Sequence, residues 1–143
     1  MTRVARFEID LALARAMVDA AITAATSADA LVSVAVVDAG GHLVAFARMD
    51  GAEIAGPVLA RDKAFTAVAH RIATHELTEL TAPGGDLAGM HSADAGRYIT
   101  FGGGLPLWDL DRVVGGIGVS GGTGEQDIRA AGAGRDVFER ARA

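Results

Sequence analysis

Hydrophobic and polar positions along the chain predict helices at both ends and strands between them. From about residue 7 to residue 27, apolar residues recur every three or four positions, as on one face of an amphipathic helix. Residues 31–38 and 42–50 are rich in apolar and β-branched residues, which favours strands. The intervening Asp-Ala-Gly-Gly sequence predicts a tight hairpin turn, since glycine adopts positive φ without a steric penalty.

The middle of the chain predicts a second helix over residues 56–72. Gly56 and Pro57 favour a helix start, because proline is well accommodated at the first helical position. The apolar residues expected to form its buried side are Val58, Phe65, Val68 and Ile72. The spacing i, i+3 and i+7 predicts a polar stripe made of Lys63, Thr66 and His70.

The second half predicts a long loop, a group of strands and a last helix. Residues 81–96 are typical of a loop, and long loops in compact domains often form lids or binding segments. Residues 97–122 predict two or three strands, with a turn at 109–111. Thr123 begins the last helix with Gln126 three residues on, which is a capping-box pattern. The residues expected to face the sheet are Ile128, Ala131, Phe138 and Ala141.

Together these elements predict a single domain over residues 1–143 with an α+β fold. Strands that follow one another in the sequence are joined by short turns, which makes the sheet mainly antiparallel. We expect about five strands flanked by N-terminal, central and C-terminal helices, in a profilin-like layered sandwich. A chain of this length buries enough surface for a core without disulfides.

The composition narrows the classes of function. The net charge of −5 and the aromatic content of 5% argue against nucleic-acid binding, which needs a basic face or a stacking platform. No apolar run is long enough for a membrane span, so no membrane partner is expected. The absence of cysteine excludes thiolate catalysis and cysteine metal sites. Glu8, Asp10 and Asp19 interrupt the N-terminal apolar pattern, which differs from a secretion signal and predicts a cytoplasmic protein.

Two glycine-rich stretches raise the question of a bound ligand. Gly116, Gly118 and Gly121 satisfy the pattern G-x-G-x-x-G, but the chain ends within the helix that follows. Nicotinamide binding requires a further strand and an acidic residue after that helix. No nicotinamide or flavin is therefore expected, and close strand-to-helix packing explains these glycines better. The three glycines at 102–104 indicate either a bend at the sheet edge or a backbone brought close to a ligand.

Histidines and a few charged residues are the remaining candidates for chemistry. The histidines are His42, His70, His75 and His91, and no two of them have the i, i+4 spacing of a helical zinc site. His42 adjoins the glycine turn and His70 lies on the Lys63 stripe, which sets these two apart. The charges expected nearest to one another are Arg48, Asp50 and Lys63. Such a group would suit an acidic small molecule, and an ordinary surface ion pair is the alternative.

Three segments, taken in order, resemble the GlcG/HbpS-like family, often called the haem-degrading domain. They are VAVVDAGGHLVAFARMDGA, ARDKAFTAVAH and FGGGLPLWDLDRVVGGIGVSGGTGEQD, within about Val34 to Asp127. The resemblance implies an antiparallel sheet flanked by helices and a homo-oligomer. It also implies a relationship to the C-terminal domain of PduO-type corrinoid adenosyltransferases. The family includes haem-binding proteins, so haem or another tetrapyrrole is the cofactor that the resemblance implies.

The resemblance also implies a ligand site near the hairpin turn. The predicted site residues are His42, Arg48, Asp50, Lys63, Thr66, Gly103 and Gly104. In a haem-binding protein that assists haem breakdown or iron handling, one of the four histidines would be the axial ligand of the iron. Arg48 or Lys63 would then be available to the propionates.

Two other functions stay open. The first is an enzyme acting on a small organic acid, such as an isomerase, hydratase or lyase. In that enzyme Lys63 or His70 would be the general base, and Arg48 would hold the carboxylate. The second is a non-catalytic accessory domain of an oligomer, in which the glycine motifs serve packing alone. Haem binding depends on a histidine, catalysis on Lys63 and Arg48, and assembly on none of these residues.

Overall fold

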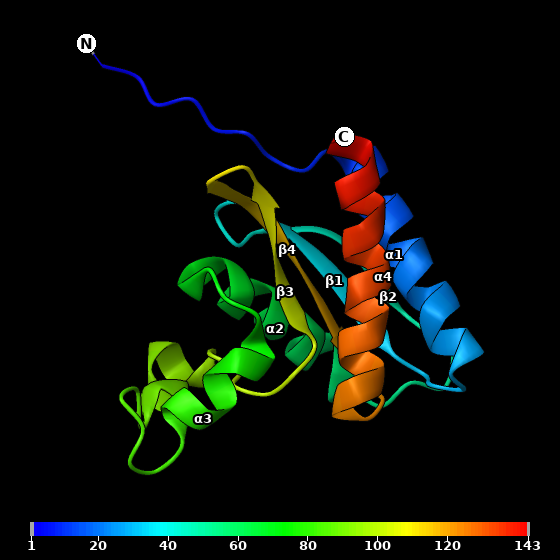
Figure 1. Ribbon diagram of the computed structural model, residues 1–143. Helices are drawn as coiled ribbons and strands as arrows, with labels where there is room; N and C mark the ends of the chain where they lie inside the picture. The colour runs from blue at the N-terminus through cyan, green and yellow to red at the C-terminus, as the bar shows by residue number, and fades with distance from the viewer. Residues whose placement is uncertain (1, 143) are drawn as a thin grey trace.

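A computed structural model describes residues 2–142, and its elements follow the predicted order (Figure 1). The helices are α1 (Leu11–Ser27), α2 (Gly56–His70), α3 (Leu77–Thr81) and α4 (Gly124–Arg142). The strands are β1 (Ser33–Asp38), β2 (Leu43–Arg48), β3 (Gly104–Asp109) and β4 (Arg112–Ser120). Short 3₁₀ helices lie at Thr74–Glu76, Met90–Ser92 and Asp94–Gly96. The predicted α+β class is confirmed.

Within residues 2–142 the strands form a four-stranded antiparallel sheet in the order β2-β1-β4-β3, rather than a sheet of about five. Of the two or three strands predicted over residues 97–122, two form, and residues 97–103 run as a loop across α2. Side chains hold this segment: Ile99 N–H donates to Thr66 Oγ1 at 3.0 Å. The Thr78 hydroxyl donates to the carbonyl oxygen of Thr100 at 2.6 Å. These side chains bind the middle of the segment, and pairing with β4 begins only at its end, where Gly103 O accepts from Val119 N–H at 2.9 Å.

Helices cover both faces of the sheet (Figure 1). α1 and α4 pack side by side on one face, and α2 lies on the other. The main core lies between the sheet and the α1–α4 pair, where Met17, Val34, Ile117 and Phe138 are buried. Burying one such side chain stabilises the fold by roughly 1.5–3 kcal/mol. The α1–α4 face therefore supplies most of the apolar stabilisation, and only a small apolar cluster lies between the sheet and α2.

The buried side of α2 differs from the predicted one. Its buried residues are Gly56, Ala60, Lys63, Ala64, Thr66, Ala67 and Val68. Val58 is 64% exposed, and Phe65 is only half-buried. The reason lies in β4, where a Cβ at Gly118 would overlap the carbonyl oxygen of Ala60. Val68 is buried as predicted, but the helix backbone approaches the sheet so closely that Val58 and Phe65 are left on the outer side.

Local signals set where the long helices begin. α1 begins at Leu11, later than the periodicity predicts, because Asp10 Oδ1 caps it by accepting the N–H of Leu13 at 2.8 Å. The predicted capping box of α4 is confirmed. Thr123 Oγ1 accepts from Gln126 N–H at 3.2 Å, and Gln126 Oε1 accepts from Thr123 N–H at 2.9 Å.

α4 presents only part of its predicted face to the sheet. Ala131 and Phe138 are buried and Ile128 is half-buried, but Ala141 in the last turn is exposed. The glycines in the middle of the helix do not interrupt it, because a Cβ at Gly134 would overlap Ile117 and close packing there favours glycine. Within residues 2–142, no helix has the length and apolarity that crossing a membrane requires.

Candidate functional site

Asp38 holds the β1–β2 hairpin turn, and the turn presents His42 to solvent. Asp38 Oδ1 accepts the N–H groups of Gly40 and His42, each at 2.9 Å. Of the two turn glycines, Gly41 has a positive φ of +81° and Gly40 does not. The His42 side chain is 80% exposed, and its Nδ1 lies 3.3 Å from Asp38 Oδ1. A carboxylate at Nδ1 orients an imidazole and leaves Nε2 free to act as a ligand.

An aromatic group, here named the Phe65 cluster, lies beside this turn. Its members are Phe65, His70, Arg97 and Tyr98. A Cβ at Gly41 would lie 2.6 Å from Phe65 Cδ2, so the turn packs directly on that ring. The Arg97 guanidinium lies 3.4 Å from the Phe65 centroid, and the Tyr98 ring stacks on Phe65 with centroids 6.0 Å apart. Asp62 Oδ1 accepts from Arg97 Nε at 3.3 Å, which holds the guanidinium over the ring.

The structure brings two of the four histidines to this region. The His70 ring lies edge-on to Tyr98 with centroids 4.6 Å apart. Its Nε2 is buried and has no hydrogen-bond partner among the described residues. His75 and His91 are exposed on segments that follow α2, outside the cluster. His42 is therefore the histidine near the cluster that combines an oriented ring with an exposed side chain.

Lys63, the only lysine in the sequence, is buried in an ion pair that joins α2 to α4. Its Nζ donates to Val119 O at 2.9 Å and to Asp127 Oδ2 at 3.1 Å. The two side chains are 1% and 5% exposed. Asp127 Oδ1 also accepts the N–H of Gly122 at 2.8 Å. The amine is thus enclosed by the protein and hydrogen-bonded to two protein groups.

Burial shifts the pKa values of both partners toward their neutral forms. Burial lowers the pKa of the Lys63 ammonium, and the Asp127 charge and hydrogen bond offset only part of this effect. Burial raises the pKa of the Asp127 carboxyl, against the opposing effects of the Lys63 charge and the Gly122 amide. The common cause is desolvation, which penalises charged forms.

The lowered pKa of Lys63 predicts a specific pH dependence of stability. The folded protein releases this proton at a lower pH than the unfolded chain, where the pKa is 10.5. Between the two pKa values the unfolded chain binds more protons, so the free energy of unfolding rises with pH. Measured by urea denaturation, the wild type should gain stability relative to a Lys63→Met/Asp127→Asn variant as pH rises toward 10.5. A relative loss over that range would contradict the pKa direction.

The other residues predicted around Lys63 have structural roles in this chain. Thr66 is completely buried and anchors the segment that crosses α2. Gly103 has a φ of +125°, and a Cβ there would lie 2.9 Å from Lys63 Nζ. Gly104 N–H donates to the buried hydroxyl of Thr74 at 2.9 Å. The glycines let the chain pass close over Lys63, and a role for them in ligand binding stays a prediction.

Arg48 and Asp50 lie at the opposite end of β2 from His42. Both are exposed, and the strand between them and the turn is six residues long, roughly 20 Å. Among the described residues, neither side chain forms an ion pair. Lys63 pairs with Asp127 rather than with either of these residues, because α2 directs the Lys63 side chain into the protein.

The sequence prediction did not include Arg97, Tyr98 and Asp127 among the site residues, and it placed Phe65 in the core. Tyr98 is the only tyrosine in the chain, which is a compositional signal. Arg97 and Asp127 contact partners 35 and 64 positions away, so no local spacing could indicate them.

Comparison with known proteins identifies the family. The model for the haem degrading protein HbpS-like family matches residues 9–136. The chain belongs to the HbpS-like family. A solved structure of a Streptomyces reticuli HbpS double mutant shares 33% identity with it. That match covers 96% of this chain and 90% of the HbpS chain, with a TM-score of 0.83. The resemblance inferred from the three sequence segments is confirmed.

Two further relatives connect this HbpS-like chain to PduO. A solved PduOC:heme complex is 37% identical, covers 91% of this chain and 94% of that chain, and has a TM-score of 0.88. Corrinoid adenosyltransferase PduO of Citrobacter freundii is 43% identical over 112 residues. That match covers 78% of this chain but 33% of PduO, so the chain spans about a third of that enzyme's length.

Proposed function

We propose that this HbpS-like chain binds haem at the surface formed by the hairpin turn and the Phe65 cluster, and that it does so as a homo-oligomer. The observation that carries the proposal is the exposed His42, oriented by Asp38 on a turn that packs against Phe65. The likeness to a PduOC:heme complex, at 37% identity over 94% of that chain, supports haem as the ligand.

Three groups of this site have chemistry that fits haem. His42 Nε2 would ligate the iron while Nδ1–H donates to Asp38, which increases the basicity of the ring. Phe65 and Tyr98 would offer aromatic surface to the porphyrin. The Arg97 guanidinium would pair with a propionate. When bound, haem supplies a redox-active iron, and a role in haem breakdown or iron handling would follow from that chemistry.

The two residues predicted from the sequence as propionate partners, Lys63 and Arg48, are less well placed for that role than Arg97. Lys63 would have to leave Asp127 to reach a ligand outside the protein, since its side chain is 1% exposed. Arg48 lies at the far end of β2 from His42. The same enclosure of Lys63 weakens the alternative in which it acts as a general base on a small acid, because a base must reach the proton that it removes.

The homo-oligomer rests on large apolar side chains that a single copy leaves in solvent. Those on β2, in the turn that follows it and at the start of α2 are Leu43, Phe46, Ile54 and Val58. Where exposed apolar side chains form a large contiguous patch, the patch marks a site of contact with another molecule. The HbpS-like chain therefore has unused contact surface on the side of the sheet that also carries the haem site.

Haemin is expected to raise the melting temperature of the wild-type protein. A ligand at 100 times its Kd adds about 2.7 kcal/mol to the free energy of unfolding. For a chain of this size that corresponds to a shift of roughly 5–10 °C. Differential scanning calorimetry measures the shift, and iron-free protoporphyrin is the matched control. Ligation by a histidine predicts a larger shift with haemin. Equal shifts with both compounds, or none with either, would contradict the proposal.

A further inference from the structure

The exposed edge of the sheet points to the surface through which copies of this chain meet. We propose that two copies pair through β2, with the two strands antiparallel across a two-fold axis and the two α1 helices facing each other beside it. This inference rests on the homo-oligomer of the proposed function and names its contact surface.

The two edges of the sheet differ in how they are protected. β3 forms one edge and contains Pro106, which lacks an N–H group and so weakens that edge as a template for pairing. β2 forms the other edge, and its sequence LVAFAR has no proline, lysine or acidic residue; its one charged residue, Arg48, stands at the last position of the strand. Natural sheets normally block an exposed edge with such residues. The unblocked edge of β2 is therefore suited to pairing with another strand.

The hydrogen-bond pattern of β2 leaves backbone groups facing away from the sheet. Met49 N–H donates to Val32 O, and antiparallel pairs alternate between bonded and non-bonded positions. Counting along the register, Ala47 and Ala45 bond to β1, so the N–H and C=O of Phe46 point outward. These groups lie at the middle of the strand, where a two-fold axis would place them opposite the same groups of a second copy.

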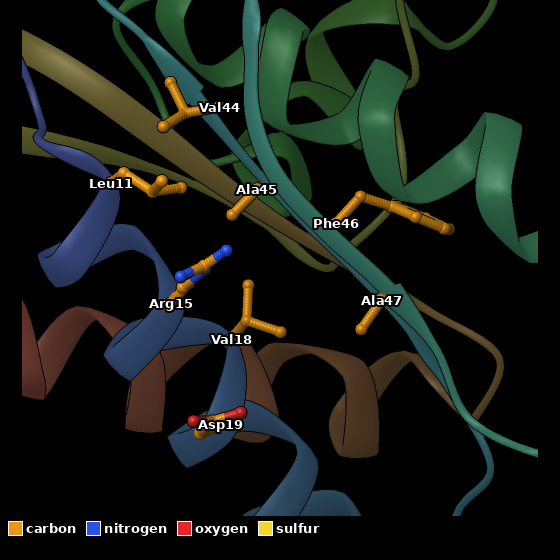
Figure 2. A pocket seen from close by; sticks show the side chains of 8 residues that line it. All are labelled: Leu11, Arg15, Val18, Asp19, Val44, Ala45, Phe46 and Ala47. Atoms are coloured by element: carbon orange, nitrogen blue, oxygen red, sulfur yellow. The ribbon is translucent and has the colours of Figure 1, made fainter.

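On the α2 side of the sheet, β2 carries exposed apolar side chains. Leu43 is 46% exposed and Phe46 is 40% exposed. Figure 2 shows Phe46 pointing away from α1, toward the α2 side. Pairing of β2 with a second copy about an axis at Phe46 would bring the two Phe46 side chains next to each other, where a cross-strand aromatic pair stabilises a sheet.

The other side of the edge carries a groove between β2 and α1, with a volume of about 440 Å³ (Figure 2). Arg15 and Asp19 line it from α1, one helical turn apart. Among the described residues, neither forms an ion pair. A two-fold axis passing between them would place Arg15 opposite Asp19 of the second copy, and the reverse. The groove is thus self-complementary in charge, as an interface between identical copies requires.

A single two-fold axis can relate both the α1 helices and the β2 strands of the two copies. In Figure 2, Leu11 lies beside Val44 at one end of the groove, and Ala47 lies at the other end of the same strand. α1 and β2 therefore run along the groove in the same direction. Starting from Leu11 beside Val44, the midpoint between Arg15 and Asp19 lies roughly 9 Å along α1 and Phe46 lies roughly 7 Å along β2, so one axis can pair both the helices and the strands.

The 143-residue sequence has no cysteine, so an introduced cysteine is its only thiol and can be cross-linked selectively. Phe46→Cys places a thiol next to the proposed axis. Leu110→Cys is the control, because Leu110 is 84% exposed in the β3–β4 turn. With a short bis-maleimide, we expect Phe46→Cys to form covalent dimers at least ~10-fold faster than Leu110→Cys, since the proposed interface holds its thiols at high effective concentration. Circular dichroism verifies that both variants are folded.

Charge exchange tests the position of the axis. Arg15→Asp places two acidic residues opposite each other at both symmetric contacts, and should lower the dimer fraction measured by light scattering. Adding Asp19→Arg should restore it. A monomeric wild type would overturn both the homo-oligomer and this interface. An oligomeric wild type in which Phe46→Cys cross-links no faster than Leu110→Cys would overturn the interface alone. A double variant as weak as Arg15→Asp would overturn the axis, and none of these outcomes bears on haem binding.

Discussion

Lys63→Ala should lower the free energy of unfolding by about 3–5 kcal/mol, since it leaves the Asp127 carboxylate buried without its counter-charge. The side chains are 1% and 5% exposed, so solvent provides little compensation. Val119 O and the carboxylate both lose a donor. Urea denaturation followed by circular dichroism measures the effect. It would be among the largest for any single substitution in this chain, because the pair joins α2 to the start of α4.

The matched control removes both charges together. Lys63→Met with Asp127→Asn keeps similar volumes, and asparagine can still accept the Gly122 N–H. Replacing a whole buried ion pair is far less costly than breaking one. We therefore expect the double variant to recover most of the stability that Lys63→Ala loses. A loss below about 1 kcal/mol in Lys63→Ala would show that the pair is effectively solvated, as in a surface ion pair.

Gly118→Ala should lower the free energy of unfolding by about 3 kcal/mol, because it forces α2 away from the sheet. A Cβ at this position would overlap Ala60 O and lie 2.6 Å from Ala64 N. Both are backbone atoms, so no side-chain rotation relieves the overlap. The helix that carries Phe65 and Lys63 must move, and haem affinity should fall along with stability.

Gly132→Ala provides the control for adding a methyl group at a glycine. Gly132 lies inside α4, and nothing lies within 4 Å of the added Cβ. Alanine is a better helix former than glycine by roughly 0.5–1 kcal/mol, so this variant should be slightly more stable than the wild type. A loss of stability in Gly118→Ala no greater than the change in Gly132→Ala would contradict the close approach of α2 to β4.

Much of the fold could be predicted from the sequence because its signals are local. The Asp-Ala-Gly-Gly turn, the capping box at Thr123 and the Asp-Leu-Asp turn all depend on residues a few positions apart. The predictions that differed depend on distant contacts. Residues 97–103 do not form a further strand, because Thr66 and Thr78 hold part of this segment across α2. The buried side of α2 is set by glycines of β4, which no helical periodicity could reveal.

In the candidate site too, the residues marked by local signals could be predicted and those that depend on distant contacts could not. His42 could be selected from the sequence because it follows the glycine turn directly. The aromatic surface beside it could not, since Arg97 and Tyr98 reach Phe65 only through the segment that crosses α2. Lys63 was predicted as a ligand or catalytic residue, and its partner Asp127 lies 64 positions away. A side chain's type is visible in the sequence, but its burial and its partner are properties of the fold.

A haemin titration followed at the Soret band tests the central claim most directly. The wild type and the variants His42→Ala, His70→Ala, His75→Ala and His91→Ala are titrated side by side. We expect saturable, stoichiometric binding by the wild type, and loss of the wild-type Soret maximum in His42→Ala alone. His75→Ala and His91→Ala serve as exposed-histidine controls, and both should retain the wild-type spectrum. A weak shift that is the same in all five proteins would contradict haem binding at the hairpin turn.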